Sequence, residues 1–113
     1  VSSTKKAKEY SEILNRYYSQ VGLPIKITKH FVDRLHDPRN SPPISISEIA
    51  SFFAKLIKKQ HNILLTMLPE DSIQVYEQES NISVPILKTE HGLLALTIMR
   101  GEMRRRGSSQ LLI

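Results

Sequence analysis

The first part of the chain has the spacing of an amphipathic helix. Between residues 4 and 21, apolar side chains recur at alternating intervals of three and one, which places them on one helical stripe. Serine and threonine residues at its start can cap this helix, and Gly22 ends it. We interpret its tyrosines as core residues rather than as a platform for stacking bases, because aromatic residues that stack on RNA usually lie on sheets. The stripe consists of Tyr10, Ile13, Leu14, Tyr17, Tyr18 and Val21.

A short extended entry at residues 25–28 leads into a second predicted helix over residues 29–36. Thr28 is suited to cap its start. Asp37 precedes Pro38, and a residue before proline is disfavoured in the helical region, so the helix should stop there.

A third helix is predicted over residues 46–59. Ser45 and Glu48 have the spacing of a capping box immediately before it. The apolar pattern leaves open whether this helix continues to Leu68 or restarts after Gln60.

The pattern then changes to short apolar runs. Residues 73–76 fit either a strand or a helical turn. Residues 82–88 and 93–99 are partly β-branched, and the four residues between them predict a hairpin turn in which Gly92 supplies a positive φ. Residues 110–113 predict a last short strand.

Helical periodicity therefore comes first and strand periodicity second. This order predicts an α+β fold in which N-terminal helices pack on one face of a small antiparallel sheet. A length of 113 residues is enough for one core, so residues 1–113 are expected to form a single domain.

Composition narrows the expected partners. The chain has 16 Lys and Arg against 11 Asp and Glu, a formal charge of +5 and a pI of about 9.6. This excess favours a polyanionic partner, RNA or DNA first and an anionic membrane surface second. The absence of cysteine rules out a disulfide framework, a thiolate metal site and a cysteine nucleophile.

The four histidines lack the spacing of a zinc site, so neither a catalytic metal nor another cofactor is expected. The chain shows no signal peptide and no run long enough to span a membrane, and no membrane partner is expected. Val1 in place of an initiator methionine fits either a trimmed chain or a proteolytically matured protein.

The segment around the second helix carries the strongest candidate chemistry. His30 and Arg34 are four residues apart and would share one face, while Phe31 and Leu35 share the neighbouring face and can enter a core. Cleavage of RNA by its own 2′-hydroxyl needs a base, an acid and cations around the phosphorus, but no metal. Imidazole and guanidinium are suited to these tasks. The alternative is an ordinary surface helix, in which a histidine near an aspartate forms a structural pair.

Further candidates come from the end of the chain. Arg100 is a candidate to hold the phosphate beside His30 and Arg34. The run Arg104, Arg105 and Arg106 is a candidate for nucleic-acid binding, together with Ser108 or Ser109. The competing interpretation of the arginine run is a solvated connecting loop.

The loop at residues 37–43 holds three of the six prolines, which restrict its backbone. One interpretation is a rigid spacer between two helices. The other is that the loop holds Arg39 beside His30 and Arg34 to form one cationic pocket that binds nucleic acid.

Two runs support a resemblance to a known family. Residues 28–35 read TKHFVDRL and residues 44–49 read ISISEI. Together they resemble the opening of small proteins in the barnase, colicin and RelE-like endoribonuclease superfamily, to which RegB-like enzymes belong. The resemblance implies helices before a four-stranded antiparallel sheet and metal-independent RNA cleavage. It also implies catalytic roles for His30 and Arg34 and, by looser matches, for Arg100 and a late serine.

A second resemblance covers more of the chain. It rests on HFVDR at residues 30–34, DPRN at 37–40, VP at 84–85 and TIMR at 97–100. These runs resemble small head-associated or ejected proteins of T-even-type bacteriophages. The resemblance implies a location in the virion interior or the host cytoplasm, but no particular activity. The alternative to an RNA-cleaving enzyme is therefore a non-enzymatic phage protein that binds nucleic acid or inhibits a host protein.

Overall fold

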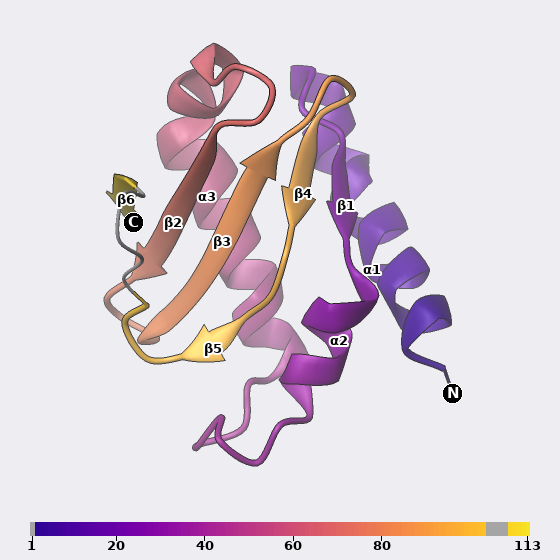
Figure 1. Ribbon diagram of the computed structural model, residues 1–113, viewed down its shortest axis with the longest axis vertical. Helices are drawn as coiled ribbons and strands as arrows, with labels where there is room; N and C mark the ends of the chain where they lie inside the picture. The colour runs from indigo at the N-terminus through magenta and orange to yellow at the C-terminus, as the bar shows by residue number, and fades with distance from the viewer. Residues whose placement is uncertain (1, 104–108) are drawn as a thin grey trace.

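The computed structural model describes residues 2–103 and 109–113, and it confirms the α+β class, with three helices packed against a sheet (Figure 1). Figure 1 shows α1 and α3 behind the sheet and α2 at the end of β1. The helices are α1 (Ser3–Tyr18), α2 (Lys29–Leu35) and α3 (Ile46–Thr66), with a 3₁₀ turn (Ser19–Val21) after α1. The strands are β1 (Ile25–Ile27), β2 (Ser72–Glu77), β3 (Ile82–Lys88), β4 (Leu93–Ala95), β5 (Met99–Arg100) and β6 (Ser109–Leu112).

The helix starts follow the local signals. Thr28 Oγ1 accepts a hydrogen bond from the backbone N–H of Phe31 at 3.0 Å, which caps α2. Ser45 and Glu48 form the expected capping box at the start of α3. Gln60 has a non-helical φ of −131° inside α3, so the helix continues to Thr66 across a kink. Both alternatives for this helix are therefore partly right.

The sheet is mixed, and the prediction of an antiparallel sheet was wrong at its edges. The strand order is β1-β4-β3-β2-β6, with β5 paired to β3. The pairs β2 with β3 and β3 with β4 are antiparallel, as expected from short connections. The pairs β1 with β4 and β2 with β6 are parallel. Each parallel pair joins segments that are far apart in the sequence, so no local turn signal could reveal its direction.

The hairpin between β3 and β4 is confirmed. The N–H of Thr89 donates to the carbonyl of Gly92 at 2.7 Å, and Gly92 has a φ of +153°. The ambiguous residues 73–76 belong to a strand, β2. Residues 93–99, expected as one strand, instead divide into β4 and the start of β5, with Leu96 still donating its N–H to the carbonyl of Pro85.

The helix α1 buries only part of the predicted stripe. Its buried residues are Ala7, Leu14 and Tyr18, and the Tyr18 hydroxyl donates to the carbonyl of Phe53 at 2.6 Å. Burial raises the pKa of Tyr18 well above its usual value. Three members of the predicted stripe are exposed instead, because α1 presents only part of a broad apolar surface to the core. They are Ile13, Tyr17 and Val21.

The outer edge of β1 is occupied by side chains of α1. The amide of Asn15 both donates to the carbonyl of Ile25 at 2.8 Å and accepts from its N–H at 2.7 Å. Ser11 Oγ accepts from the N–H of Ile27 at 2.8 Å. These bonds replace those of a further strand and protect the sheet edge.

Candidate functional site

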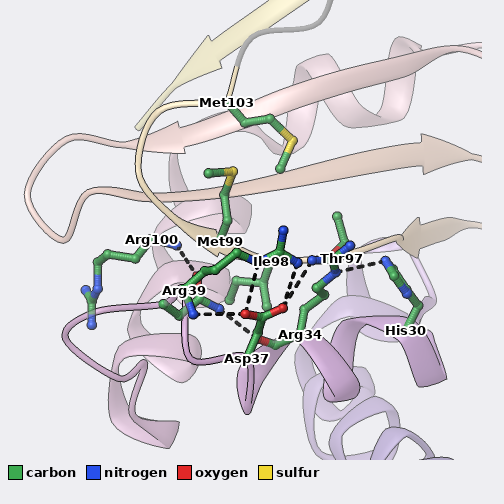
Figure 2. Close-up of a pocket in the computed structure, with 10 residues that line it drawn as sticks. His30, Arg34, Asp37, Arg39, Thr97, Ile98, Met99, Arg100 and Met103 are labelled. Atoms are coloured by element: carbon green, nitrogen blue, oxygen red, sulfur yellow. Dashed lines mark hydrogen bonds and ion pairs between the residues drawn. The ribbon is translucent and has the colours of Figure 1, made fainter.

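A pocket of about 290 Å³ lies between α2, the loop that follows it, and the chain from the end of β4 into β5 (Figure 2). In Figure 2, the charged side chains of α2 and its loop lie on one side, and Met99 and Met103 lie on the other. The lining residues are His30, Arg34, Asp37, Arg39, Asn40, Thr97, Ile98, Met99, Arg100 and Met103.

The helix α2 positions His30 and Arg34. Its apolar residues Phe31, Val32 and Leu35 are buried and determine which face of this two-turn helix is left at the pocket. Thr28 also donates from its hydroxyl to the carbonyl of Leu96 at 2.8 Å, which ties the start of α2 to the strand segment opposite. On the remaining face, Arg34 Nε donates to His30 Nε2 at 3.3 Å. The predicted pairing of these two side chains at i and i+4 is therefore present.

Asp37 links two arginines at the pocket. Its carboxylate accepts from Arg34 Nη1 at 3.2 Å, and from Arg39 Nε and Nη2 at 3.0 and 2.8 Å. It also accepts from the backbone N–H of Arg39 at 2.9 Å. The Arg39 side chain is 74% exposed, whereas that of Asp37 is only 19% exposed. One partly buried carboxylate therefore orients two guanidinium groups whose charge it offsets only in part.

Asn40 holds the loop in place. It is buried, it donates from Nδ2 to the carbonyl of Arg34 at 2.7 Å, and its Oδ1 accepts from the backbone N–H of Arg100 at 2.9 Å. The end of α2 and strand β5 are thus joined through one side chain of the loop. Of the two interpretations of residues 37–43, the structure supports the one in which Arg39 lies at one pocket with His30 and Arg34.

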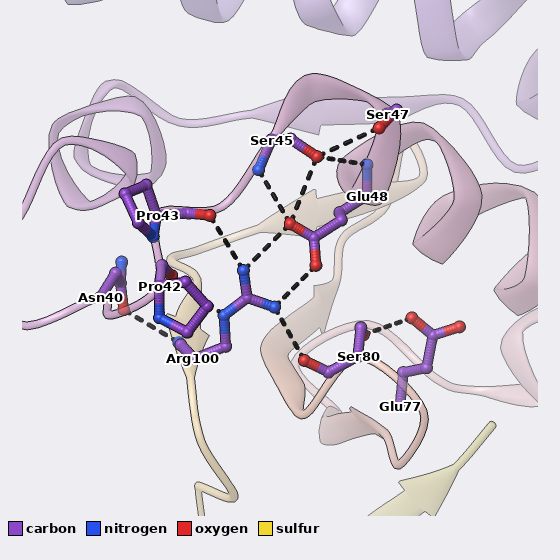
Figure 3. A network of polar contacts seen from close by, with 9 residues as sticks. All are labelled: Asn40, Pro42, Pro43, Ser45, Ser47, Glu48, Glu77, Ser80 and Arg100. Atoms are coloured by element: carbon purple, nitrogen blue, oxygen red, sulfur yellow. Dashed lines mark hydrogen bonds and ion pairs between the residues drawn. The ribbon is translucent and has the colours of Figure 1, made fainter.

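Arg100 lines the pocket, but its guanidinium points away from it (Figure 2). Figure 3 shows this group inside a network of acceptors. An arginine side chain has five N–H donors, and five hydrogen bonds are made. Two go to the carboxylate of Glu48, at 2.7 and 2.9 Å. The other three go to the carbonyls of Pro42, Pro43 and Ser80.

These contacts give Arg100 a structural role in place of the expected phosphate-holding one. Its side chain is 8% exposed. Hydrogen bonds from Arg100 and from the backbone N–H of Ser45 lower the pKa of Glu48 to about 2, and the hydrogen bonds and charge of Glu48 raise the pKa of Arg100. The partner of Arg100, Glu48, lies 52 residues earlier in the chain. From the sequence alone, Glu48 is expected only to cap α3.

A second histidine, His36, follows α2 directly, is exposed and does not line the pocket. Arg104, Arg105, Arg106 and Ser108 lie outside the described residues, so their expected role in binding nucleic acid stays a prediction, and Ser109 begins β6.

The three prolines of the loop suggested that Arg39 and Asn40 are held in place, but not that Asn40 itself bonds to Arg34 and Arg100. The contribution of residues 97–99 was missed. Asp37 was recognised as part of the segment but interpreted as a helix stop. The sequence did hold a signal that Asp37 would orient Arg39. An aspartate can accept a hydrogen bond from the backbone N–H two residues later, and here that residue is an arginine whose side chain can also donate to it. The contribution of residues 97–99 had no local signal, since they meet the loop only through the fold.

Within residues 2–103 and 109–113, no three His, Asp or Glu side chains gather in a way that could hold a metal ion. In the same part of the chain, no helix is both long and apolar enough to cross a bilayer.

No protein-family model, curated protein or solved structure matches this chain.

Proposed function

We propose that this protein binds RNA and cleaves it without a metal ion, with the pocket around His30 as the phosphate site. The observation that supports the proposal most directly is the meeting of His30, Arg34 and Arg39 at one pocket. An imidazole beside two guanidinium groups matches the needs of phosphoryl transfer, namely a group that moves a proton near neutral pH and cations that stabilise charge on phosphorus.

The arrangement suggests a role for each group. His30 Nε2 accepts a hydrogen bond from Arg34, so it carries a lone pair, which can act as a general base once Arg34 turns from His30 to the phosphate. In the proposed reaction, His30 takes the proton of a 2′-hydroxyl, and the freed oxygen attacks the adjacent phosphorus. The bond from phosphorus to the 5′ oxygen breaks, leaving a 2′,3′-cyclic phosphate, and the 5′ oxygen takes a proton from solvent. Arg34 and Arg39 hold the nonbridging oxygens.

Arg100 has no contact with the phosphate in this proposal. Its bonds to Glu48, Pro42 and Pro43 join the loop to the start of α3. Together with Asn40, it keeps the loop that carries Arg39 against strand β5. We assign both residues a positioning role.

A second candidate function is binding without cleavage. It is favoured by one observation: among the described lining residues, the pocket offers a single imidazole, and the guanidinium of Arg100 is taken up by Glu48. In this case the protein is a non-enzymatic phage protein, located in the virion interior or the host cytoplasm, that binds nucleic acid or a host protein.

Incubation with RNA in EDTA separates the two functions. Cleavage by the wild type, with fragments that end in 2′,3′-cyclic phosphate, supports the enzyme. Loss of cleavage in His30→Ala but not in His36→Ala assigns it to the pocket, since His36 lies just after the same helix without lining the pocket. Intact RNA with the wild type, or equal cleavage by His30→Ala, would exclude the enzymatic function.

Anion binding tests the pocket independently of cleavage. Arg39→Ala should weaken binding of sulfate or phosphate several-fold while leaving the melting temperature within about 2 °C, because the side chain is largely exposed. Lys59→Ala on α3 is the matched control, since Lys59 is exposed and lies outside the pocket. A strongly lowered melting temperature with unchanged anion binding would make Arg39 a structural residue.

A further inference from the structure

A second hollow lies beside the His30 pocket, between α1 and the edge strand β1. It has a volume of about 570 Å³, and its walls come from α1, β1, the first residue of α2 and Leu94 of β4. Lys29 lines this hollow, and the next residue, His30, lines the first pocket. Consecutive residues at the start of α2 thus line two different hollows, at the point where Figure 1 shows the chain turning from β1 into the helix.

The second hollow combines a cationic rim with an apolar floor. Three lysines line it, and each comes from a different element: Lys8 from α1, Lys26 from β1 and Lys29 from α2. No carboxylate of the described residues lines it. Lys29 does pair with Asp33 at 3.3 Å, but both side chains are substantially exposed, so this pair costs little to open. Leu94 and Ala7 supply apolar surface between the lysines.

The register of the sheet explains this combination. Lys26 and Leu94 are direct partners in the parallel pair of β1 and β4, so they lie on the same face of the sheet. Ile25 and Ile27 point to the opposite face and are buried in the core. A lysine and a leucine are thereby held side by side on the face away from the core.

A third hollow adjoins the second. It has a volume of about 340 Å³ and shares Lys26 and Leu94 with the second hollow. Its far end is formed by the turn of the β3–β4 hairpin, where His91 is exposed. The second and third hollows thus adjoin at Lys26 and Leu94, and Lys29 of the second hollow is the chain neighbour of His30 in the first.

We infer that these hollows form a binding track for single-stranded RNA, with phosphates on Lys29, Lys26 and Lys8 and a base on the apolar surface of Leu94. This inference rests on the proposed function, since the track leads away from the phosphate site at His30. The charge of the rim is complementary to a polyanion, and alternating cations and apolar surface suit an unpaired strand. A duplex keeps its bases stacked inside and cannot place one in such a hollow.

Binding of labelled RNA of increasing length tests the track. A dinucleotide can occupy only the His30 pocket, whereas an octanucleotide can also reach the second and third hollows. For wild type, we expect the octanucleotide to bind at least ten-fold more tightly than the dinucleotide, and more tightly than a duplex of the same length. Lys26→Glu and Lys8→Glu should abolish this gain and leave dinucleotide binding unchanged. Lys58→Glu, a charge reversal at an exposed position of α3, is the matched control.

Salt dependence gives a second measurement. Each phosphate contact removed from a single strand should lower the slope of log affinity against log salt by about 0.7, for the octanucleotide only. Equal binding of the two lengths, equal effects of Lys26→Glu and Lys58→Glu, or preference for the duplex would overturn the track while leaving the pocket in place. If the dinucleotide itself does not bind, and Arg39→Ala changes nothing, the proposed function fails and the track fails with it.

Discussion

The guanidinium of Arg100 meets the carboxylate of Glu48 in a two-pronged ion pair, with Nη1 2.7 Å from Oε2 and Nη2 2.9 Å from Oε1. Strand β5 is thereby joined to the first turn of α3, and the same guanidinium donates to two carbonyls of the intervening loop (Figure 3). The pair therefore holds the second half of the loop that carries Arg39, at Pro42 and Pro43, against β5 and the start of α3.

Removing one member of this ion pair should destabilise the fold. Arg100→Ala leaves Glu48 without its partner and is expected to lower the free energy of unfolding by about 3 kcal/mol. A change of this size corresponds to a melting temperature lowered by roughly 10 °C. Thermal unfolding followed by circular dichroism measures it, with Arg16→Ala on the exposed side of α1 as the control. Unchanged stability together with lost anion binding would restore Arg100 as a phosphate ligand.

The ion pair of Arg100 with Glu48 also predicts that the free energy of unfolding depends on pH. The pKa of Glu48 is lowered from 4.5 to about 2, so the folded state binds its proton less readily than the unfolded state. Its contribution is therefore present in full above about pH 5 and is lost as the pH falls from there to about 2. Urea unfolding at several pH values should show wild type losing on the order of 2 kcal/mol more than Glu48→Gln over this range. Glu12→Gln, an exposed carboxylate of α1, should retain the wild-type pH profile.

Asn40 offers a test of positioning. Asn40→Ala removes two hydrogen bonds at a buried site, to the carbonyl of Arg34 and from the N–H of Arg100, at an expected cost of about 2 kcal/mol. Because Asp37 and Arg39 then lose their support, sulfate or phosphate binding should weaken as well. Asn40→Asp keeps the acceptor for Arg100 but loses the donor to Arg34, so an intermediate effect is expected. Stability and anion affinity, measured in parallel against the exposed Asn62→Ala, distinguish this role from simple core packing.

The turn before β4 has little room for a side chain. A Cβ atom on Gly92 would lie 2.1 Å from the carbonyl oxygen of Pro24, and that carbonyl accepts the N–H of Leu93 at 2.7 Å. Gly92→Ala should therefore break the contact between β1 and β4 and cost at least about 3 kcal/mol. Gly22 also has a positive φ but open space around it, so Gly22→Ala should cost only about 1 kcal/mol. Similar losses in denaturant unfolding for both variants would contradict a steric role for Gly92.

Much of the local structure could be predicted from the sequence. The caps at Thr28 and Ser45, the stop after α2 and the hairpin turn at Gly92 appear as expected. The order of helices before strands holds for β2 to β6, whereas β1 lies between α1 and α2. These features depend on residues within a few positions of one another, and their hydrogen bonds close within one or two turns of chain. The pairing of His30 with Arg34 belongs to the same class, because a single helical turn brings them together.

The sequence could not reveal what Arg100 binds or which side of α1 is buried. Arg100 pairs with Glu48, which lies on a different element of the fold. A run of cations in the sequence does not indicate which residue, here 52 positions away, will be the partner. On α1, Leu14 and Tyr18 are buried while Ile13 and Tyr17 are exposed, although all four fit the same periodic pattern. Only packing against Phe53 of α3 and the edge of β1 selects between these faces.

The sequence by itself therefore determined the elements, their caps and one half of the candidate site, the face of α2 with His30 and Arg34. The tertiary structure decided the parallel edges of the sheet, the partly buried ion pair of Arg100 with Glu48 and the opposite wall of the pocket at residues 97–99. The physical reason is the same in each case. Local hydrogen bonds and turn conformations depend on neighbours in the chain, whereas strand direction, ion-pair partners and pocket walls depend on which distant segments the core brings together.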